Sequence, residues 1–405
     1  MASSSSPGRQ QQPPAPVTKI LLTGASGYVG QFFLESLITN PPPPCGSGEG
    51  REYVVHALHR SNPQLKDAVE KLQQQRKQDP SGNVKIRVAQ VDVGDSEEVA
   101  SFFKEHGNPH FDVCIHTAAV SSPKACNSDP DAARRANVPS ALFDALLSSQ
   151  PPAQTTKIIA MSTDQVYDGT KPPYADEDED ETNPVNVYGE TKLEMERYLV
   201  EKANAGSAKS KSNAKIRLLR STLVFGPKPP LADEGVNPKR DTFLHFIASR
   251  LDAEASSDAS EGGPLDFYTD ERRNPVSVRD VVDVLRHFAF EEDDEGGGGG
   301  GGGGGDVEIY NLCGPETLNR HEMAVRVFRH LGAGDVTASR HLRAAKKADL
   351  NPPPAIRTPS NLEISCDKLA RRMADPSDLA AAKFKTFDEI LIDTFGPPWS
   401  NKAIK

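Results

Sequence analysis

Short apolar segments alternate with amphipathic segments over the first half of the chain. We expect strands at Val17–Thr23, Tyr53–His59, Val84–Val91, Asp112–Ala118, Lys157–Ser162 and Lys215–Leu219. The spacing of apolar positions predicts helices at Tyr28–Thr39, Pro63–Lys77, Ser96–Glu105, Asp131–Ser148 and Val187–Lys202. Apolar strands that alternate with helices are typical of a parallel sheet covered on both faces. The pattern therefore predicts an α/β fold, a doubly wound parallel sheet of the Rossmann type, over residues 17–225.

The alternation weakens after Gly226. Helices are predicted there at Thr242–Leu251, Val278–Phe290 and Arg320–Leu331, and strands at Leu265–Tyr268 and Val307–Leu312. We interpret residues 226–395 as a smaller carboxyl-terminal α/β lobe that binds the substrate. Within it, residues 291–306 contain ten consecutive glycines and are expected to form a flexible loop. Residues 1–16 are expected to be a disordered tail, and residues 396–405 a carboxyl-terminal tail.

Composition and charge exclude several classes of function. Asp176–Glu181 and Glu291–Glu295 hold eleven of the 57 acidic residues, so most of the formal net charge of −10 belongs to two loops. No basic patch suited to nucleic acid is visible, and no apolar run approaches the length of a membrane span. The five cysteines show no metal-binding spacing, so we expect no metal site. We expect free thiols and a cytoplasmic location, with an organelle transit peptide as the less favoured alternative.

A glycine-rich turn follows the first predicted strand. Thr23–Gly30 reads TGASGYVG and joins that strand to the first helix. Glycines at this position allow a tight turn and let backbone N–H groups approach a pyrophosphate. The sequence therefore predicts a dinucleotide site whose contacts come from Gly24, Ser26, Gly27, Tyr28, Val29 and Gly30.

The ends of the next three strands bear on which dinucleotide is bound. The second strand is followed by Arg60 and by no acidic residue, which favours NADP(H), with NAD(H) as the alternative. Asp92, after the third strand, is placed to meet the adenine. Ala118 and Ala119, after the fourth, are small enough for a cofactor to pass closely. Ser121 is expected either to reach the substrate or to cap the following turn.

Three copies of a Tyr-x-x-x-Lys pattern occur, at Tyr167/Lys171, Tyr188/Lys192 and Tyr198/Lys202. A phenol has a pKa of about 10 and needs a nearby cation to act as an acid–base group at neutral pH. Spacing of four places both side chains on one face of a helix. The first copy lies in a loop and the third lies far along the helix. We therefore select Tyr188 and Lys192, at the start of a helix, as catalytic candidates.

The fifth strand ends in Ser162–Gly169, which reads STDQVYDG. Ligands of open parallel sheets bind beyond the carboxyl ends of the strands. Thr163 is therefore predicted to hydrogen-bond both a substrate carbonyl oxygen and the Tyr188 phenol. The alternative is that Ser162 or Thr163 only caps the next turn.

The segments GASGYVG, STDQVYDG, YGETK and RSTLVFGP occur in this order, followed by DERRNPVSVRDVV and YNLCGPE. Together they resemble the extended short-chain dehydrogenase/reductases, and within these the dTDP-4-dehydrorhamnose reductase-like branch. The resemblance extends from about Val17 to about Phe395, interrupted by low-complexity loops. Related 4,6-dehydratases carry Thr-Asp-Glu after the fifth strand, whereas this chain has Gln165, which cannot exchange a proton as a carboxyl does. Epimerases usually have small residues there, so the resemblance favours the reductases.

The resemblance implies a mechanism and two functions. NADPH would reduce the 4-keto carbon of a deoxyhexose on a nucleoside diphosphate, while Tyr188 donates a proton. Lys192 would lower the phenol pKa and hold the nicotinamide ribose, and Thr163 would orient the carbonyl. Arg273, or its neighbour Arg272, would contact the diphosphate. The same branch includes the NADP-binding regulatory β subunit of methionine adenosyltransferase, so a partnership with that enzyme's catalytic subunit is the alternative function.

Overall fold

The structure is a computed structural model that describes residues 16–42, 51–75, 83–148, 154–175, 181–205, 214–236, 242–255, 263–291, 306–374 and 383–398. Most of the predicted amino-terminal tail, the poly-glycine run, most of the acidic segment Asp176–Glu181 and the last residues of the carboxyl-terminal tail lie outside these ranges. The expectations for those segments therefore stay predictions.

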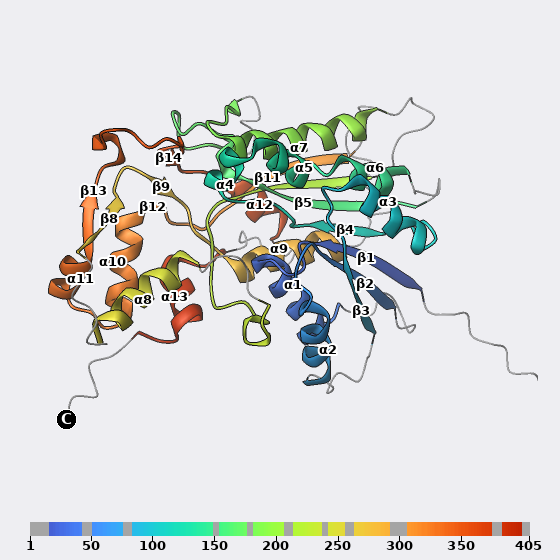
Figure 1. The fold of residues 1–405 in the computed structure, drawn as a ribbon, viewed down its shortest axis with the longest axis horizontal. Helices are drawn as coiled ribbons and strands as arrows, with labels where there is room; N and C mark the ends of the chain where they lie inside the picture. The colour runs from blue at the N-terminus through green and yellow to red at the C-terminus, as the bar shows by residue number, and fades with distance from the viewer. Residues whose placement is uncertain are drawn as a thin grey trace, which may run out of the picture.

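A parallel sheet of seven strands forms the centre of the larger part of the molecule (Figure 1). Its order is β11-β6-β5-β4-β1-β2-β3. The strands are β1 (Val17–Thr23), β2 (Glu52–His59), β3 (Val84–Gln90), β4 (Val113–His116), β5 (Lys157–Thr163), β6 (Lys215–Ser221) and β11 (Asp306–Leu312). The chain order reverses between β1 and β4, which creates the point where such sheets bind ligands.

Helices cover both faces of this sheet, as the apolar pattern predicts. The buried side chains of one face pack with α1 (Tyr28–Thr39), α2 (Leu65–Gln75), α9 (Val278–Phe290) and α12 (Asp367–Arg372). Those of the other face pack with α3 (Ser96–Glu105), α6 (Ser140–Ser148) and α7 (Val187–Asn204). Two short helices, α4 (Pro123–Ser128) and α5 (Pro130–Asn137), lie beside α7. The predicted doubly wound α/β fold is confirmed.

Two predictions about elements need correction. The single helix expected at Asp131–Ser148 is two helices, because Pro139 disfavours a helical conformation at Val138 and ends α5. The strand expected in the second lobe, β11, instead pairs in parallel with β6 and forms the edge of the large sheet. The chain therefore returns to the large sheet after residue 226, and the lobe is not formed by one continuous segment.

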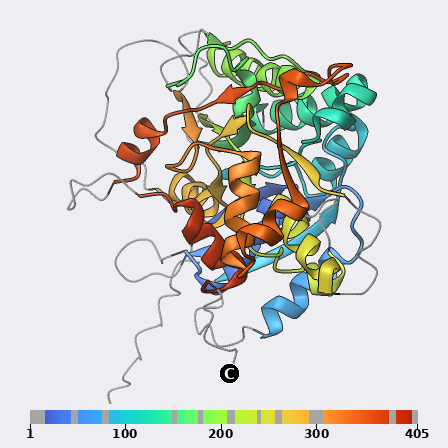
Figure 2. The ribbon, with the colours of Figure 1, turned by 90° about the vertical axis from the view of Figure 1, so that its left-hand side faces the viewer.

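The smaller lobe lies beyond the carboxyl ends of the strands (Figure 1), and Figure 2 looks onto its outer side. Its core joins α8, α10, α11 and α13 with β7, β8 and β13. The helices are α8 (Phe243–Ala255), α10 (Arg320–His330), α11 (Asp335–His341) and α13 (Phe387–Phe395). Short strands β7 (Val224–Phe225), β8 (Leu265–Tyr268), β9 (Arg272–Arg273), β10 (Val276–Ser277), β12 (Leu318–Asn319), β13 (Leu342–Ala345) and β14 (Asn361–Leu362) complete it. The connections between helices and strands also contain single turns of 3-10 helix, namely η1 (Asp164–Val166), η3 (Ala232–Glu234) and η4 (Lys347–Asp349).

A buried ion pair fixes α7 to the sheet. The Arg220 guanidinium on β6 donates to the Glu196 carboxylate on α7 at 2.8 Å, and both side chains are 2% exposed. The Ser162 hydroxyl also donates to Glu196, and Arg220 donates to the Tyr167 hydroxyl at 2.9 Å. Burial alone would lower the pKa of Arg220, but Glu196 and Tyr167 raise it above its usual value. The helix that carries Tyr188 is therefore held by a fully paired charge network.

Removing one partner of this network should destabilise the fold strongly. Glu196→Gln leaves the Arg220 charge buried without its counter-ion, and we expect the free energy of unfolding to fall by about 3–5 kcal/mol. Urea denaturation measures this change. Asp266→Asn, at the exposed Arg343–Asp266 pair on the lobe, is the matched control and should change stability little. Similar losses from both variants would contradict the role given to the buried pair.

Candidate functional site

The turn between β1 and α1 lies against the loop that follows β4. Gly24 has a φ of +71°, and a Cβ added there would lie 2.7 Å from the Ala118 backbone nitrogen and 2.8 Å from Thr117 Oγ1. Glycine is the residue that tolerates both this conformation and this approach. The structure therefore brings Gly24 and Ala118, predicted from separate motifs, to the point where the strand order reverses.

Gly27 and Gly30 keep the start of α1 close to the same turn. A Cβ on Gly30 would lie 2.3 Å from the Gly24 carbonyl oxygen, and one on Gly27 would lie 3.0 Å from it. Gly27 is the N-cap of α1, and within the described chain its helix has no side-chain cap. The first N–H groups of a helix lack intrahelical acceptors and favour an anion. This cradle fits the pyrophosphate of a dinucleotide.

The remaining residues predicted in this turn make protein contacts. The Tyr28 hydroxyl donates to the Pro227 carbonyl oxygen at 2.9 Å, so its side chain ties α1 to the segment after β7. The Ser26 carbonyl oxygen accepts a hydrogen bond of 2.9 Å from the Gln31 side chain. The backbone N–H groups of Ser26, Tyr28 and Val29 remain the part of the turn predicted to face a cofactor.

The other predicted binding residues lie after neighbouring strands. Arg60 is exposed after β2, and Ala119 and Ser121 are exposed between β4 and α4. The Asp92 carboxylate, after β3, accepts the backbone N–H of Gly94 at 3.0 Å. All four lie at the carboxyl edge of the sheet, and their contacts with a cofactor or a substrate stay predictions.

The first turn of α7 packs closely on the turn after β5. The Asn186 side chain caps α7 by accepting the Gly189 N–H at 3.0 Å, and it donates to Gln165 Oε1 at 3.0 Å. A Cβ on Gly189 would lie 2.2 Å from the Gln165 carbonyl oxygen. Glycine is therefore required for the approach that places Tyr188 beside Thr163. Sequence reasoning missed both Asn186 and Gly189, although YGETK contains the glycine.

Thr163 and Tyr188 are brought together, as predicted. Both are buried, at 3% and 9% exposure, and their hydroxyls are hydrogen-bonded. Thr163 Oγ1 also donates to Asp164 Oδ1 at 3.2 Å and accepts the Gln165 N–H at 3.2 Å. Since the Thr163 proton is directed to Asp164, the Tyr188 hydroxyl is the donor to Thr163. A carbonyl oxygen placed here would therefore compete with Thr163 for the Tyr188 proton.

Burial controls the ionisation of the Tyr188/Lys192 pair. It raises the pKa of Tyr188, although the contact with Thr163 opposes this. It also lowers the pKa of Lys192 to about 8, against the effect of Glu196. The Lys192 ammonium donates to the Met195 sulfur at 3.3 Å. The lowered phenol pKa that the resemblance implied is therefore not seen, because burial outweighs the other influences on Tyr188.

The two other Tyr/Lys copies have structural contacts. The Tyr198 hydroxyl and the Lys202 ammonium both bind the Asp144 carboxylate at 2.7 Å, which joins α7 to α6. The Tyr167 ring stacks on Tyr174 with centroids 4.4 Å apart. These contacts agree with the choice of Tyr188/Lys192 as the candidate pair.

Asn137 is a further site residue that no motif indicated. Its side chain is fully buried, accepts the Val120 N–H at 2.7 Å and donates to Thr191 Oγ1 at 2.9 Å. It thereby holds the loop after β4 against α7. The sequence places Asn137 inside the helix predicted at Asp131–Ser148, and it does not show whether the amide is buried or solvated.

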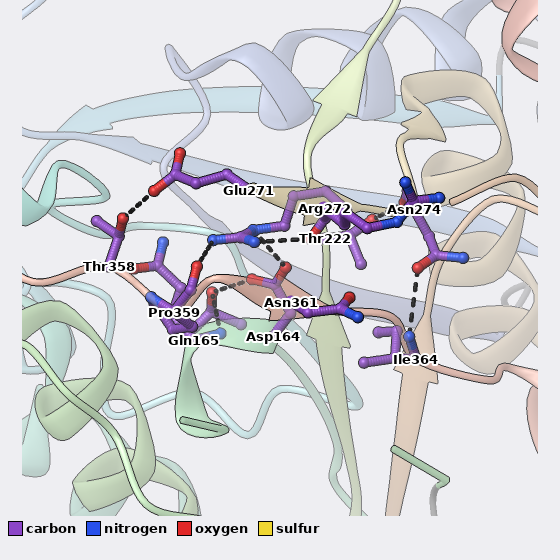
Figure 3. A network of polar contacts seen from close by, with 12 residues as sticks. Asp164, Gln165, Thr222, Glu271, Arg272, Asn274, Thr358, Pro359, Asn361 and Ile364 are labelled. Atoms are coloured by element: carbon purple, nitrogen blue, oxygen red, sulfur yellow. Dashed lines mark hydrogen bonds and ion pairs between the residues drawn. The ribbon is translucent and has the colours of Figure 1, made fainter. Parts of the chain in front are cut away.

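Arg273 connects the lobe to the sheet. Its guanidinium lies 3.7 Å from the Asp164 carboxylate after β5 and donates to the Pro359 carbonyl oxygen at 2.7 Å. Asp164 and Pro359 are both labelled in Figure 3. It also donates to the Ser360 and Arg272 carbonyl oxygens at 3.3 and 2.7 Å. Substrate binding by Arg273 stays a prediction, and these contacts favour a role in joining the two parts of the molecule.

The described residues contain no group of three or more His, Cys, Asp or Glu side chains arranged to hold a metal ion. In the same ranges, no helix combines the length and apolar character needed to cross a bilayer.

Residues 18–383 match the family described as the RmlD substrate binding domain. The chain belongs to this family. The match includes the seven-stranded sheet and the lobe up to residue 383, which leaves out α13. The site described above, where the sheet and the lobe meet, therefore lies within the part of the chain that matches the RmlD family.

Curated relatives and solved structures point in two directions. The rat (Rattus norvegicus) protein named methionine adenosyltransferase 2 subunit beta is 28% identical over 280 residues, covering 69% of this chain and 70% of the relative. A Bacillus anthracis dTDP-4-dehydrorhamnose reductase in complex with NADP shares the fold, with a TM-score of 0.58 at 15% identity over 92% of this chain and 97% of that one. A Bifidobacterium longum UDP-glucose 4-epimerase with NAD+ and UDP gives 0.62 at 17% over 94% and 97%.

The buried Asp164 carboxyl of this RmlD-type domain should make stability depend on pH. Burial raises its pKa from the usual 3.8 to about 6, although Arg273 opposes the shift. Between those values the folded protein retains a proton that the unfolded chain has lost, so stability falls as the pH rises through this range. Asp164→Asn cannot ionise. Its free energy of unfolding relative to the wild type should therefore rise by about 2–3 kcal/mol between pH 4 and pH 7. Urea denaturation at each pH tests this, and a constant difference would contradict it.

Proposed function

We propose that this protein is an NADPH-dependent reductase of a 4-keto-6-deoxy nucleotide sugar. The observation that carries the proposal is the hydrogen-bonded Thr163–Tyr188 pair, with Lys192 one turn later, at the edge of the sheet that also carries the glycine turn. The family membership and the shared fold with a dTDP-4-dehydrorhamnose reductase support it. We also place the protein in the cytoplasm.

The cofactor proposal starts from the uncapped first turn of α1. The backbone at Gly24, Gly27 and Gly30 would hold the pyrophosphate of a nicotinamide dinucleotide, and Lys192 its nicotinamide ribose. When bound as NADPH, the cofactor would supply the hydride for reduction of a carbonyl. Arg60 after β2, where an acid would favour NAD, supports NADP(H) as the preferred form.

Tyr188 would supply the proton in this reaction. Its raised pKa keeps the phenol protonated at neutral pH, which is the state needed to neutralise an alkoxide. Thr163 already accepts the Tyr188 proton, so a substrate carbonyl oxygen in its place would be correctly oriented. Lys192, with a pKa of about 8, is able to return a proton to Tyr188 near neutral pH.

Gln165 supports reduction over elimination of water. Its side-chain oxygen accepts a hydrogen bond from Asn186, so the amide helps to position α7. An amide cannot provide the acid–base step that a glutamate provides in the related dehydratases. Tyr188 is the proton donor that we propose for a single carbonyl reduction.

The test is NADPH oxidation in the presence of a dTDP-4-keto-6-deoxyhexose, followed at the nicotinamide absorbance. The wild-type protein should turn over, and Tyr188→Phe should lose at least about 100-fold in kcat because it lacks the proton. Tyr198→Phe is the matched control, since Tyr198 lies on the same helix but binds Asp144. Turnover that survives in Tyr188→Phe, or that falls equally in both variants, would reject the assignment of Tyr188.

A regulatory function is the second candidate, because the matching curated relatives are methionine adenosyltransferase 2 beta subunits. Under this proposal the protein binds the catalytic subunit of methionine adenosyltransferase and changes its kinetics. Co-purification of the two proteins, with a changed KM for methionine, is the expected result. Absence of a complex in size-exclusion chromatography would reject it, whatever the outcome of the NADPH assay.

A further inference from the structure

Two cysteines lie where the chain leaves the large sheet and where it returns to it. Cys313 directly follows β11, and Cys366 is the N-cap of α12. The residues between them include α10, α11 and β13, which belong to the core of the lobe. Cys313 and Cys366 therefore stand at the two ends of one long excursion of the chain into the lobe.

The structure holds these two ends against each other. The Lys368 ammonium, on α12, donates to the Ile309 carbonyl oxygen of β11 at 2.9 Å. The Cys366 thiol donates to the Cys313 carbonyl oxygen at 3.3 Å, and the Cys313 thiol donates to the Ile364 carbonyl oxygen at 3.3 Å. Each sulfur thus lies beside the backbone of the other segment, so that rotation of the two side chains about their Cα–Cβ bonds is the motion that joins them.

The two thiols differ in their access to solvent. Cys366 is partly exposed, whereas Cys313 is 2% exposed. Cys114 and Cys126, the other cysteines in the described ranges, are fully buried. Burial raises the pKa of the Cys114 thiol to about 12, and the thiolate is the reactive form of cysteine. A small oxidant therefore meets Cys366 first.

We propose that Cys313 and Cys366 form a reversible disulfide by exchange with a small disulfide such as oxidised glutathione. The Cys366 thiolate attacks one sulfur of oxidised glutathione, and the other glutathione leaves and takes up the proton that Cys366 released. Cys313 then loses its proton and attacks the Cys366 sulfur, which releases the second glutathione. The protein loses two electrons and two protons, and oxidised glutathione gains them as two molecules of reduced glutathione.

The disulfide closes the base of the lobe and restrains a strap, residues 357–366, that leads from the lobe to α12. The strap contacts the candidate site at two points. The Asn186 side chain, which caps α7, donates to the Arg357 carbonyl oxygen at 3.1 Å, and Arg273 donates to the Pro359 carbonyl oxygen at 2.7 Å. The bond therefore connects the redox state of two residues at the base of the lobe to the segment that supports the site.

Peptide mapping of the full chain after incubation with oxidised glutathione tests the proposal. The remaining thiols are alkylated in urea, and the protein is digested with trypsin. Cleavage releases Cys313 in residues 287–320 and Cys366 in residues 358–368, so the disulfide joins two peptides that otherwise separate. We expect mass spectrometry to show this joined pair, lighter by two hydrogens than the two peptides together, and dithiothreitol to abolish it. Cys114, the buried control, should be recovered in its alkylated form.

Two variants separate the steps of the exchange. Cys313→Ser should stop at a glutathione adduct on Cys366, because the second thiol is missing. Cys366→Ser should leave Cys313 unmodified, because Cys313 is buried. A wild-type glutathione adduct on Cys366 without the joined peptides, a disulfide to a different cysteine, or no oxidation of either residue would overturn the proposal.

The oxidised wild type should also unfold at a higher urea concentration. The two cysteines are 53 positions apart, and a disulfide that closes a loop of this length should raise the midpoint by about 0.5–1 M. Amide hydrogen exchange in the strap should slow at the same time. Cys313→Ser, treated in the same way, is the control and should show neither change. Joined peptides with an unchanged midpoint and unchanged exchange would contradict the restraint of the lobe.

Discussion

The contact between the first turn of α7 and the turn after β5 determines the geometry of the site. Gly189 allows the helix to approach the Gln165 carbonyl oxygen so closely that any side chain would collide. Asn186 fixes the same approach by capping α7 and binding Gln165. Without this contact, Thr163 and Tyr188 would not share a hydrogen bond. The pairing of the Tyr188 phenol with the end of β5 therefore depends on one backbone approach.

Buried charge holds the rest of the arrangement in place. The Glu196–Arg220 pair fixes α7 beneath the site, and the Asp164–Arg273 pair joins the sheet to the lobe. Each pair spans elements that are distant in sequence, so each constrains tertiary structure and not a single helix or strand. Lys192 differs from these residues, because burial lowers its pKa to about 8 and it donates only to a sulfur within the described chain. Such a weakly satisfied cation suits a group that acts on a ligand.

Many of the helices and strands were predictable from the sequence, because the apolar pattern and the residues that flank each element indicate the same bounds. The bounds of α1, α3, α9 and β1 follow from the apolar pattern and its flanking residues. The choice of Tyr188 among three copies followed from helix geometry. The placement of β11 at the sheet edge was not predictable, since strand pairing depends on tertiary contacts across the whole chain. Asn137 was missed for the same reason, because the burial of a side chain is a property of the fold.

The most direct test of the account is a crystal structure of the protein with NADP+. The account predicts the pyrophosphate on the glycine turn at Gly24–Gly30, a ribose hydroxyl bound to Lys192, and the nicotinamide ring beside Tyr188 and Thr163. Lys192 should then exchange its contact with Met195 for the ribose. A dinucleotide bound elsewhere, or one whose nicotinamide lies away from Tyr188, would contradict the central claim that this edge of the sheet is the reaction centre.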